Sequence, residues 1–208
     1  MILVDFKLLS KYDIAFPHSL MAYNVQEVQA AAEKIGYPLA IKAISPQVLH
    51  KSDRGGVLLG INTRQEAVKA AELLSHRYKG VKLEGFLVQR MAGSKTAVEL
   101  IIGGKRDAQF GQLLMLGMGG IFVEVFKDVS FRVCPINEDD AKEMIGELVA
   151  HPILAGARGR KPINESALVA TLLRVSRLLQ HENPKEFDLN PVFADEKGCV
   201  AVDMRLIR

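Results

Sequence analysis

The strongest constraint in this sequence is the apolar run 38–41, which ends at Lys42 and is followed by a polar loop with adjacent glycines. Such a run predicts a short buried strand, so the lysine places a positive charge where the strand meets the loop. The loop then offers residues that suit phosphate chemistry: His50, Lys51, Ser52, Gly55 and Gly56. Adjacent glycines let backbone N–H groups approach phosphate oxygens, and a neutral imidazole can act as a nucleophile. The alternative is that His50 is a turn residue that bonds Asp53.

Length and composition exclude several classes of protein. A chain of 208 residues can bury a core in one large domain or in two small lobes. The formal charge of +3 is too small to favour nucleic acid, and the absence of Trp argues against a base-stacking surface. No apolar run approaches the ~20 residues of a membrane span, and the N-terminus lacks the pattern of a secretory signal. We therefore expect a cytoplasmic protein that binds neither nucleic acid nor membrane, with Cys134 and Cys199 reduced.

Helical and extended patterns alternate along the chain, which predicts a mixed α+β fold. Gly36 follows a segment of helix formers and is typical of a helix end, whereas Thr63 with Glu66 indicates a helix start with a capping box. We expect helices at 7–12, 26–35, 65–78, 138–149 and 165–180. We expect strands at 38–44, 57–61, 86–89, 97–102, 113–116, 131–135 and 199–206.

A second glycine cluster, 117–120, precedes an apolar pair. It lacks the third glycine of the dinucleotide-binding fingerprint, and the phosphate-loop pattern with a Lys-Ser or Lys-Thr ending is absent from the sequence. Taken alone, these glycines indicate a tight turn.

Acidic and amide side chains near the C-terminus have a spacing that suits a metal ion. Asp188 and Asn190 alternate in an extended segment, and a turn around 196–198 would bring Asn190 beside Asp203. One or two hard oxygen ligands, completed by phosphates and water, are the usual protein contribution to a Mg²⁺ site. The alternative is structural: Asp188 and Asn190 would cap a turn before the following proline, and Asp203 would pair with Arg205 or a nearby lysine.

Together these motifs resemble the ATP-grasp, or beta, part of the ADP-forming acyl-CoA synthetases, which are relatives of the succinyl-CoA synthetase beta subunit. The His-Lys-Ser-Asp-x-Gly-Gly-Val loop is specific to that family rather than to ATP-grasp proteins at large. The matching segments follow the family's order over nearly the whole chain: 36–42, 45–57, 87–91, 99–103, 107–111, 117–125, 127–132, 156–162, 188–191 and 201–203.

The resemblance implies an α+β, ATP-grasp fold in which two lobes clasp Mg-nucleotide between antiparallel sheets. It implies a single ATP-grasp domain, 1–208, that contains a smaller lobe at 19–88. The larger lobe would consist of 1–18 and 89–208.

The resemblance also implies roles for individual residues. His50 would be a phosphoryl carrier, in a phosphate loop with Lys51, Ser52, Gly55 and Gly56. The implied nucleotide-binding residues are Lys42 at the phosphates, Val88, Gln89 and Met91 at the hinge near adenine, Glu99 as an acid of the pocket and Arg132 on the phosphate side. Asn190 and Asp203 would hold Mg²⁺.

The implied activity needs a partner. The chain would move a phosphoryl group between phosphohistidine and ADP or ATP in the reaction acyl-CoA + Pi + ADP = acid + CoA + ATP. The first carrier histidine and the CoA site belong to an alpha subunit or domain, so we expect a hetero-oligomer. One residue departs from the family pattern, because Arg90 stands where a glutamate is common at the hinge. Arg90 supports the alternative of a non-catalytic, nucleotide-binding regulatory module in an acyltransferase-like assembly.

Overall fold

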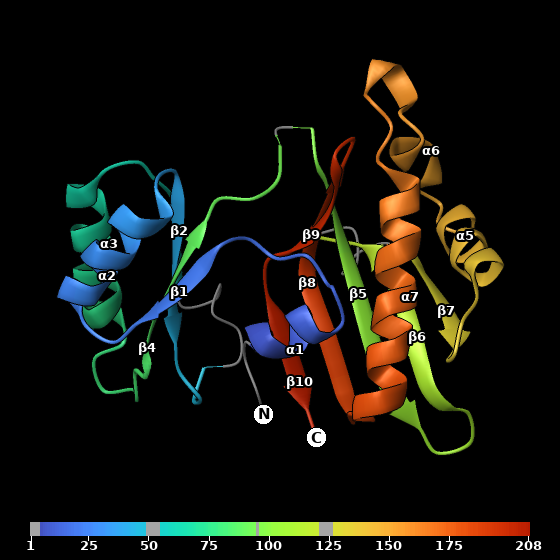
Figure 1. Ribbon diagram of the computed structural model, residues 1–208, viewed down its shortest axis with the longest axis horizontal. Coiled ribbons are helices and arrows are strands. Elements are labelled where there is room, and N and C mark those ends of the chain that lie inside the picture. Colours follow the sequence, from blue (N-terminus) through green and yellow to red (C-terminus); the bar gives the residue numbers. More distant parts are fainter. Residues whose placement is uncertain (1–4, 49–54, 95, 121–126) are drawn as a thin grey trace. The chain divides into compact units, whose positions relative to one another are not determined.

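The chain forms two compact units in the computed structural model, which describes residues 5–48, 55–94, 96–120 and 127–208 (Figure 1). The smaller unit is Pro17–Met91, and the larger unit combines Met1–Phe16 with Ala92–Arg208. The chain therefore passes from one unit to the other twice. The predicted smaller lobe, 19–88, falls inside the smaller unit.

The smaller unit is an antiparallel four-stranded sheet packed against two helices. Its strands, in the order β1-β4-β2-β3, are β1 (Ser19–Ala22), β4 (Gly85–Arg90), β2 (Leu39–Ile44) and β3 (Val57–Ile61). Its helices are α2 (Val25–Ile35) and α3 (Arg64–Arg77). Small residues such as Ala32 and Ala71 are fully buried with Leu39 and Val88, so the helices approach the sheet closely.

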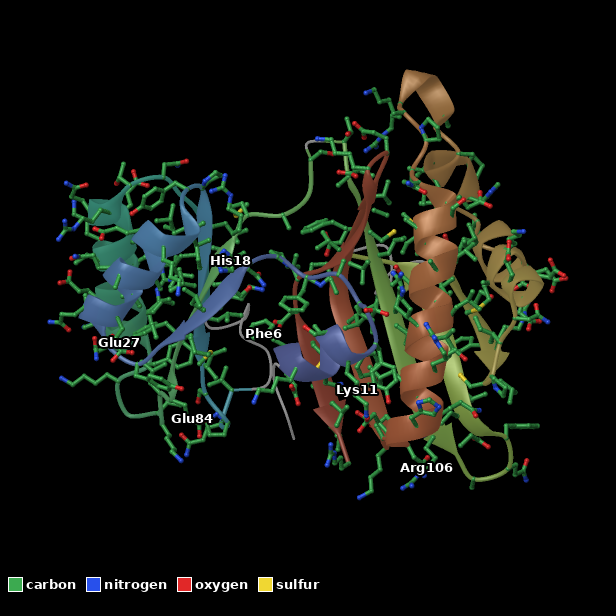
Figure 2. All side chains as sticks on the ribbon, viewed as in Figure 1. Phe6, Lys11, His18, Glu27, Glu84 and Arg106 are labelled. Carbon is green, nitrogen blue, oxygen red and sulfur yellow. The ribbon has the colours of Figure 1, made fainter. Side chains whose placement is uncertain are left out.

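Both helices of the smaller unit begin at side-chain caps. The Asn24 side chain accepts from the Glu27 N–H at 2.8 Å, and Glu27, labelled in Figure 2, accepts in return from Tyr23 N–H. Thr63 Oγ1 accepts from Glu66 N–H at 3.2 Å, which confirms the predicted start of α3. The predicted capping box is shifted by one residue, because the Glu66 carboxylate accepts from Asn62 N–H.

The larger unit is built on a six-stranded antiparallel sheet with the order β10-β8-β5-β6-β7, and β9 pairs with β8. Its strands are β5 (Val98–Asp107), β6 (Gly111–Met118), β7 (Val129–Val133), β8 (Glu186–Asp195), β9 (Gly198–Ala201) and β10 (Met204–Ile207). Its helices are α1 (Phe6–Lys11), α5 (Glu138–Gly146), α6 (His151–Leu154), the 3-10 turn η1 (Ala157–Gly159) and α7 (Glu165–Glu182).

Several predicted boundaries in the chain were wrong. The predicted helix 138–149 ends at Gly146, and a separate short helix, α6, follows. The predicted closing strand 199–206 is two strands, β9 and β10, and the strand expected at 131–135 is 129–133. Strand β1 was not predicted, because four residues are too few to show a period of two.

The two faces of the larger sheet differ, because side chains alternate between faces along each strand. The first face packs against helices: Leu114 and Leu116 of β6 are fully buried, and Gly104 lies directly under Leu179 of α7. We call this the helix-covered face. The second face carries the alternate residues: Glu99, Ile101, Gly103 and Lys105 on β5, and Leu113, Met115 and Gly117 on β6.

Long-range polar contacts join the end of α1 to the end of α7. Glu182, at the end of α7, accepts from Lys11 Nζ at 2.7 Å and from Tyr12 Oη at 2.9 Å (Lys11 is labelled in Figure 2). These bonds connect α1 to α7, although the two helices lie near opposite ends of the sequence. Within the described ranges, none of the helices is both long and apolar enough to span a membrane.

An ion-pair network fastens α5 to β7. Arg132, on the helix-covered face opposite Leu114, donates to both oxygens of Glu147 at 3.0 and 2.6 Å and to Glu143 at 3.1 Å. Ser130 Oγ also donates to Glu147. The Arg132 guanidinium, aided by Ser130, lowers the pKa of Glu147 to about 2. Because this pKa is depressed in the folded protein, ionised Glu147 stabilises the fold above its ordinary pKa of 4.5, and that stability is lost as the pH falls toward 2.

Glu147→Gln should therefore lower the free energy of unfolding at neutral pH and have little effect in acid. We expect a loss below about 1 kcal/mol, because the network is partly exposed to solvent. Urea unfolding of both proteins at pH values from about 7 to about 2 measures the difference as it shrinks. Glu143→Gln, which removes a single bond to Arg132, is the control and should cost less. A difference between Glu147→Gln and wild type that stays constant over this pH range would contradict the role of the network.

Candidate functional site

Lys42 lies near the end of β2, the strand between β3 and β4. It is opposite Val57 of β3 and Leu87 of β4, and it is only 6% exposed. The end of the predicted phosphate loop is fixed beside it, because the Gly56 carbonyl accepts from Ala43 N–H at 2.8 Å. The Gly55 carbonyl accepts from Arg77 Nη1 at 2.6 Å. Lys42 and the two glycines are therefore neighbours in space.

The remaining residues predicted for the phosphate loop are His50, Lys51 and Ser52. They lie outside the described residues, so their roles stay predictions.

The predicted hinge residues lie at the end of β4, where much of the backbone is already paired. Val88 is fully buried between Leu20 of β1 and Ile41 of β2. The Arg90 N–H donates to the His18 carbonyl, and the Met91 N–H donates to the Pro38 carbonyl at 3.0 Å. An adenine contact at Val88 or Met91 stays a prediction and would use backbone groups other than these two donors.

The Gln89 side chain has a structural partner that the sequence did not indicate. Its Nε2 donates to Ser19 Oγ at 3.0 Å, and Ser19 Oγ donates in turn to the Pro17 carbonyl at 2.7 Å. Pro17 is the first residue of the smaller unit and Met91 its last. The Gln89 amide thus joins the two segments through which the chain enters and leaves this unit.

Glu99 lies near the start of β5, on the second face of the larger sheet. It is half-buried and opposite Phe193 of β8. On its other side, β6 ends at the glycine cluster, and the Gly119 N–H donates to the Glu99 carbonyl at 2.7 Å. The glycines that the sequence linked only to a turn therefore lie against a predicted nucleotide-binding acid.

Asn190 and Asp203 occupy facing positions on the same sheet. Leu189 is opposite Met204, and the Val202 N–H donates to the Pro191 carbonyl, so the residues between these pairs face each other. An amide and a carboxylate oxygen are hard donors, which suits Mg²⁺. No group of three or more His, Cys, Asp or Glu side chains able to hold a metal ion occurs among the described residues. Phosphate oxygens and water would have to complete the coordination of an ion here.

Asp188 lies on the second face, opposite Gly103 of β5 and two residues before Asn190. It is opposite Arg205 of β10, whose guanidinium is 3.5 Å from Glu186. Burial raises the pKa of the Asp188 carboxyl, whereas the charge of Arg205 lowers it. The second face thus carries a half-buried acid next to the predicted metal-binding pair.

Arg132 lies apart from the other predicted site residues of the larger unit. It lies on the helix-covered face, where its guanidinium binds Glu143 and Glu147 of the helix region, whereas Glu99 and Asp188 lie on the second face. Its predicted contact with phosphate stays a prediction. The acids that bind it come from a segment more than ten residues later, so the strand sequence alone does not indicate them.

Comparisons with known proteins agree with this architecture. The ATP-grasp domain family matches residues 5–207. The chain is 45% identical to the beta subunit of ADP-forming acetate–CoA ligase I from Pyrococcus furiosus, covering 97% of this chain and 88% of that subunit. It is 47% identical to ADP-forming acetate–CoA ligase I from Archaeoglobus fulgidus, covering 96% of this chain but only 29% of that longer protein.

Solved structures of acetyl-coenzyme A synthetase 1 from Ca. Korarchaeum cryptofilum, described as dinucleotide-forming, are also similar. One, in complex with coenzyme A, Ca-AMPCP and HgCl⁺, has a TM-score of 0.92 and 42% identity, covering 97% of this chain and 89% of that one. Another holds coenzyme A and Mg-AMPPCP, with its phosphohistidine segment pointing towards the nucleotide-binding site. It has a TM-score of 0.83 and 41% identity, covering 96% and 87% of the two chains. Sequence and fold agree over nearly the whole length, and the chain therefore belongs to the ATP-grasp family of the beta subunits of ADP-forming acetate–CoA ligases.

Proposed function

We propose that this chain is the nucleotide-binding part of an ADP-forming acyl-CoA synthetase. It transfers a phosphoryl group between a phosphohistidine and ADP or ATP in the reaction acyl-CoA + Pi + ADP = acid + CoA + ATP. The observation that carries this proposal is the 45% identity, over 97% of the chain, to a beta subunit that bears this activity in its name. The facing positions of Asn190 and Asp203 support it independently.

The proposed roles of the residues follow from the needs of phosphoryl transfer, which is catalysed mainly by positioning and by neutralising charge. Lys42 would bind phosphate oxygens, and its burial would leave that attraction less screened by water. Asn190 and Asp203 would hold Mg²⁺, which when bound neutralises charge on the phosphates. Glu99 would bind the nucleoside, since a carboxylate repels phosphate but accepts hydrogen bonds from hydroxyl and amino groups.

His50 would carry the phosphoryl group. In the direction of ATP synthesis, its N–P bond would break as a β-phosphate oxygen of ADP forms the new P–O bond. With a proton on the second ring nitrogen of the phosphohistidine, the N–P bond electrons would leave with a neutral imidazole, which is the form that is well populated near pH 7 and that would attack ATP in the reverse direction. Lys51, Ser52, Gly55 and Gly56 would stabilise the charged group on the histidine.

The acyl and CoA chemistry would take place on an alpha partner, so the working enzyme would be a hetero-oligomer. The Archaeoglobus fulgidus relative, of which this chain spans 29%, leaves room for such a part within one polypeptide. A cytoplasmic location, without nucleic-acid or membrane partners, belongs to the same proposal.

A second candidate function is a nucleotide-binding regulatory module. Arg90 favours it, because an exposed arginine stands at the predicted hinge, with its Nη1 3.1 Å from where a Cβ on Gly36 would lie. An arginine there would change the charge presented to the nucleotide. Measured turnover with the alpha partner separates the two functions.

Lys42→Ala and Asp203→Ala should both weaken binding of Mg-ADP. The lysine supplies a charge-assisted bond of roughly 1.5–3 kcal/mol, and its loss should not be repaired by metal. The loss in Asp203→Ala should be partly reversed by excess Mg²⁺, because a metal ligand is missing. Titration calorimetry measures both. Lys69→Ala and Asp139→Ala, at exposed positions, are the controls. Unchanged affinity in both site variants would show that these residues are structural.

His50→Ala should abolish acyl-CoA synthesis by the complex with the alpha partner and leave Mg-ADP affinity nearly unchanged. The loss should be large, because no parallel route remains when a covalent carrier is removed. His76→Ala, on the exposed side of α3, is the matched control and should keep full activity. Full activity of the His50→Ala complex would overturn the carrier role, and acyl-CoA formation by the isolated chain would overturn the need for an alpha partner.

A further inference from the structure

The end of β6 passes so close to Glu99 that only glycine fits at position 119. A Cβ built on Gly119 would lie 2.6 Å from Glu99 Cγ and 2.9 Å from its carbonyl carbon and oxygen. Real Cβ atoms do not approach other heavy atoms so closely, and Gly119 is buried. The absence of a side chain at 119 therefore creates the space that the Glu99 side chain occupies.

Gly120 extends this contact to the carboxylate itself. A Cβ at Gly120 would lie 3.7 Å from Glu99 Oε2 and 3.9 Å from its carboxyl carbon. Gly120 has a φ of +63°, a left-handed conformation that disfavours most side chains. The Glu99 side chain thus lies along the two glycines, from its Cγ to its carboxylate.

On the β8 side, the cross-strand neighbour of Glu99 is an aromatic residue. Phe193 is the residue opposite Glu99 on β8, so it lies on the same face. The Phe193 ring also lies against Gly93, where an added Cβ would be 3.0 Å from it. Glu99 therefore lies between Phe193 of β8 and the glycines at the end of β6.

The end of β6 is also held on its side away from β5. The Met118 N–H donates to the Asp128 carbonyl at 3.1 Å, and a Cβ on Gly117 would be 2.8 Å from Val129 Cγ1. The Asp128 carboxylate is buried and accepts from the N–H groups of Val149 and Ala150 at 2.8 and 2.9 Å. A Cβ at position 119 would therefore press on Glu99, both on its side chain at Cγ and on its backbone carbonyl.

We propose that Gly119 and Gly120 are positioning residues that hold the Glu99 carboxylate in the orientation in which it binds the nucleoside part of ADP or ATP. The proposal rests on the proposed function, in which Glu99 belongs to the nucleotide site. In this proposal the glycine cluster 117–120 does more than form a tight turn, and it does not act as a phosphate-binding loop: two of its glycines position a carboxylate. A carboxylate restricted to one conformation loses less entropy when it accepts hydrogen bonds from a ligand.

A double-mutant cycle on Mg-ADP affinity tests this role, with titration calorimetry on wild type, Gly119→Ala, Glu99→Ala and the double variant. We expect Gly119→Ala to weaken binding about tenfold in the wild-type background, and less than about twofold when Glu99 is already alanine. The contact of the new Cβ with the backbone of residue 99 is common to both backgrounds, whereas displacement of the carboxylate can weaken binding only in the first. Gly146→Ala is the control, since a Cβ there meets no atom within 4 Å, and it should bind as wild type does.

A purely structural effect of Gly119→Ala would weaken binding equally in both backgrounds and would overturn the proposal. Should Gly119→Ala fail to fold, Gly120→Asn takes its place in the cycle, because asparagine tolerates the left-handed conformation and adds atoms at the Glu99 carboxylate. The same non-additivity is expected, and unchanged affinity of Gly120→Asn would also overturn the proposal.

Different results would contradict the proposed function and the positioning role of the glycines. Wild-type protein that does not bind Mg-ADP contradicts the proposed function itself. Wild-type protein that binds Mg-ADP while Glu99→Ala binds equally well contradicts only the role of the glycines and Glu99.

Discussion

The central pairing of β5 with β6 and β8 is the constraint on which the larger unit depends. Since β5 is bonded on both edges, its side chains can leave the sheet only toward one face or the other. Leu100 and Ile102 enter the core under the helices, and Glu99 is thereby directed to the second face. A shift of β5 by one residue would exchange these roles, so packing of the core also fixes where the acid lies.

The same alternation of side chains separates two groups of polar residues. On the helix-covered face, Arg132 is compensated by Glu143 and Glu147, and the network joins a helix to an edge strand. On the second face lies Asp188, and Asn190 and Asp203 face each other just beyond it, so acceptor oxygens occupy neighbouring positions. Acceptors concentrated in one place favour a cation, whereas a compensated pair favours attachment of one element to another.

In the smaller unit, backbone hydrogen bonds between two strands bring together the segment by which the chain enters the unit and the segment by which it leaves. Strand β1, which enters the unit, pairs with β4, which leaves it, from Ser19 opposite Gln89 to Ala22 opposite Phe86. The bond from Gln89 to Ser19 adds a side-chain link at the end of this ladder. The place at which the chain enters the unit is therefore tied to the segment predicted to be the hinge.

Local signals and motif order were enough to predict the helices with clear caps, such as the one after Thr63, the strand that bears Lys42, and the family. The sequence also indicated that Asn190 and Asp203 would meet, since a single hairpin turn follows the strand of Asn190, and Asp203 comes shortly after the returning strand. Only the tertiary structure placed Arg132 on its acids, Gln89 on Ser19, and Glu99 against Gly119. Each of these contacts joins different elements, and the packing of whole sheets and helices, which no local pattern encodes, decides which side chains meet.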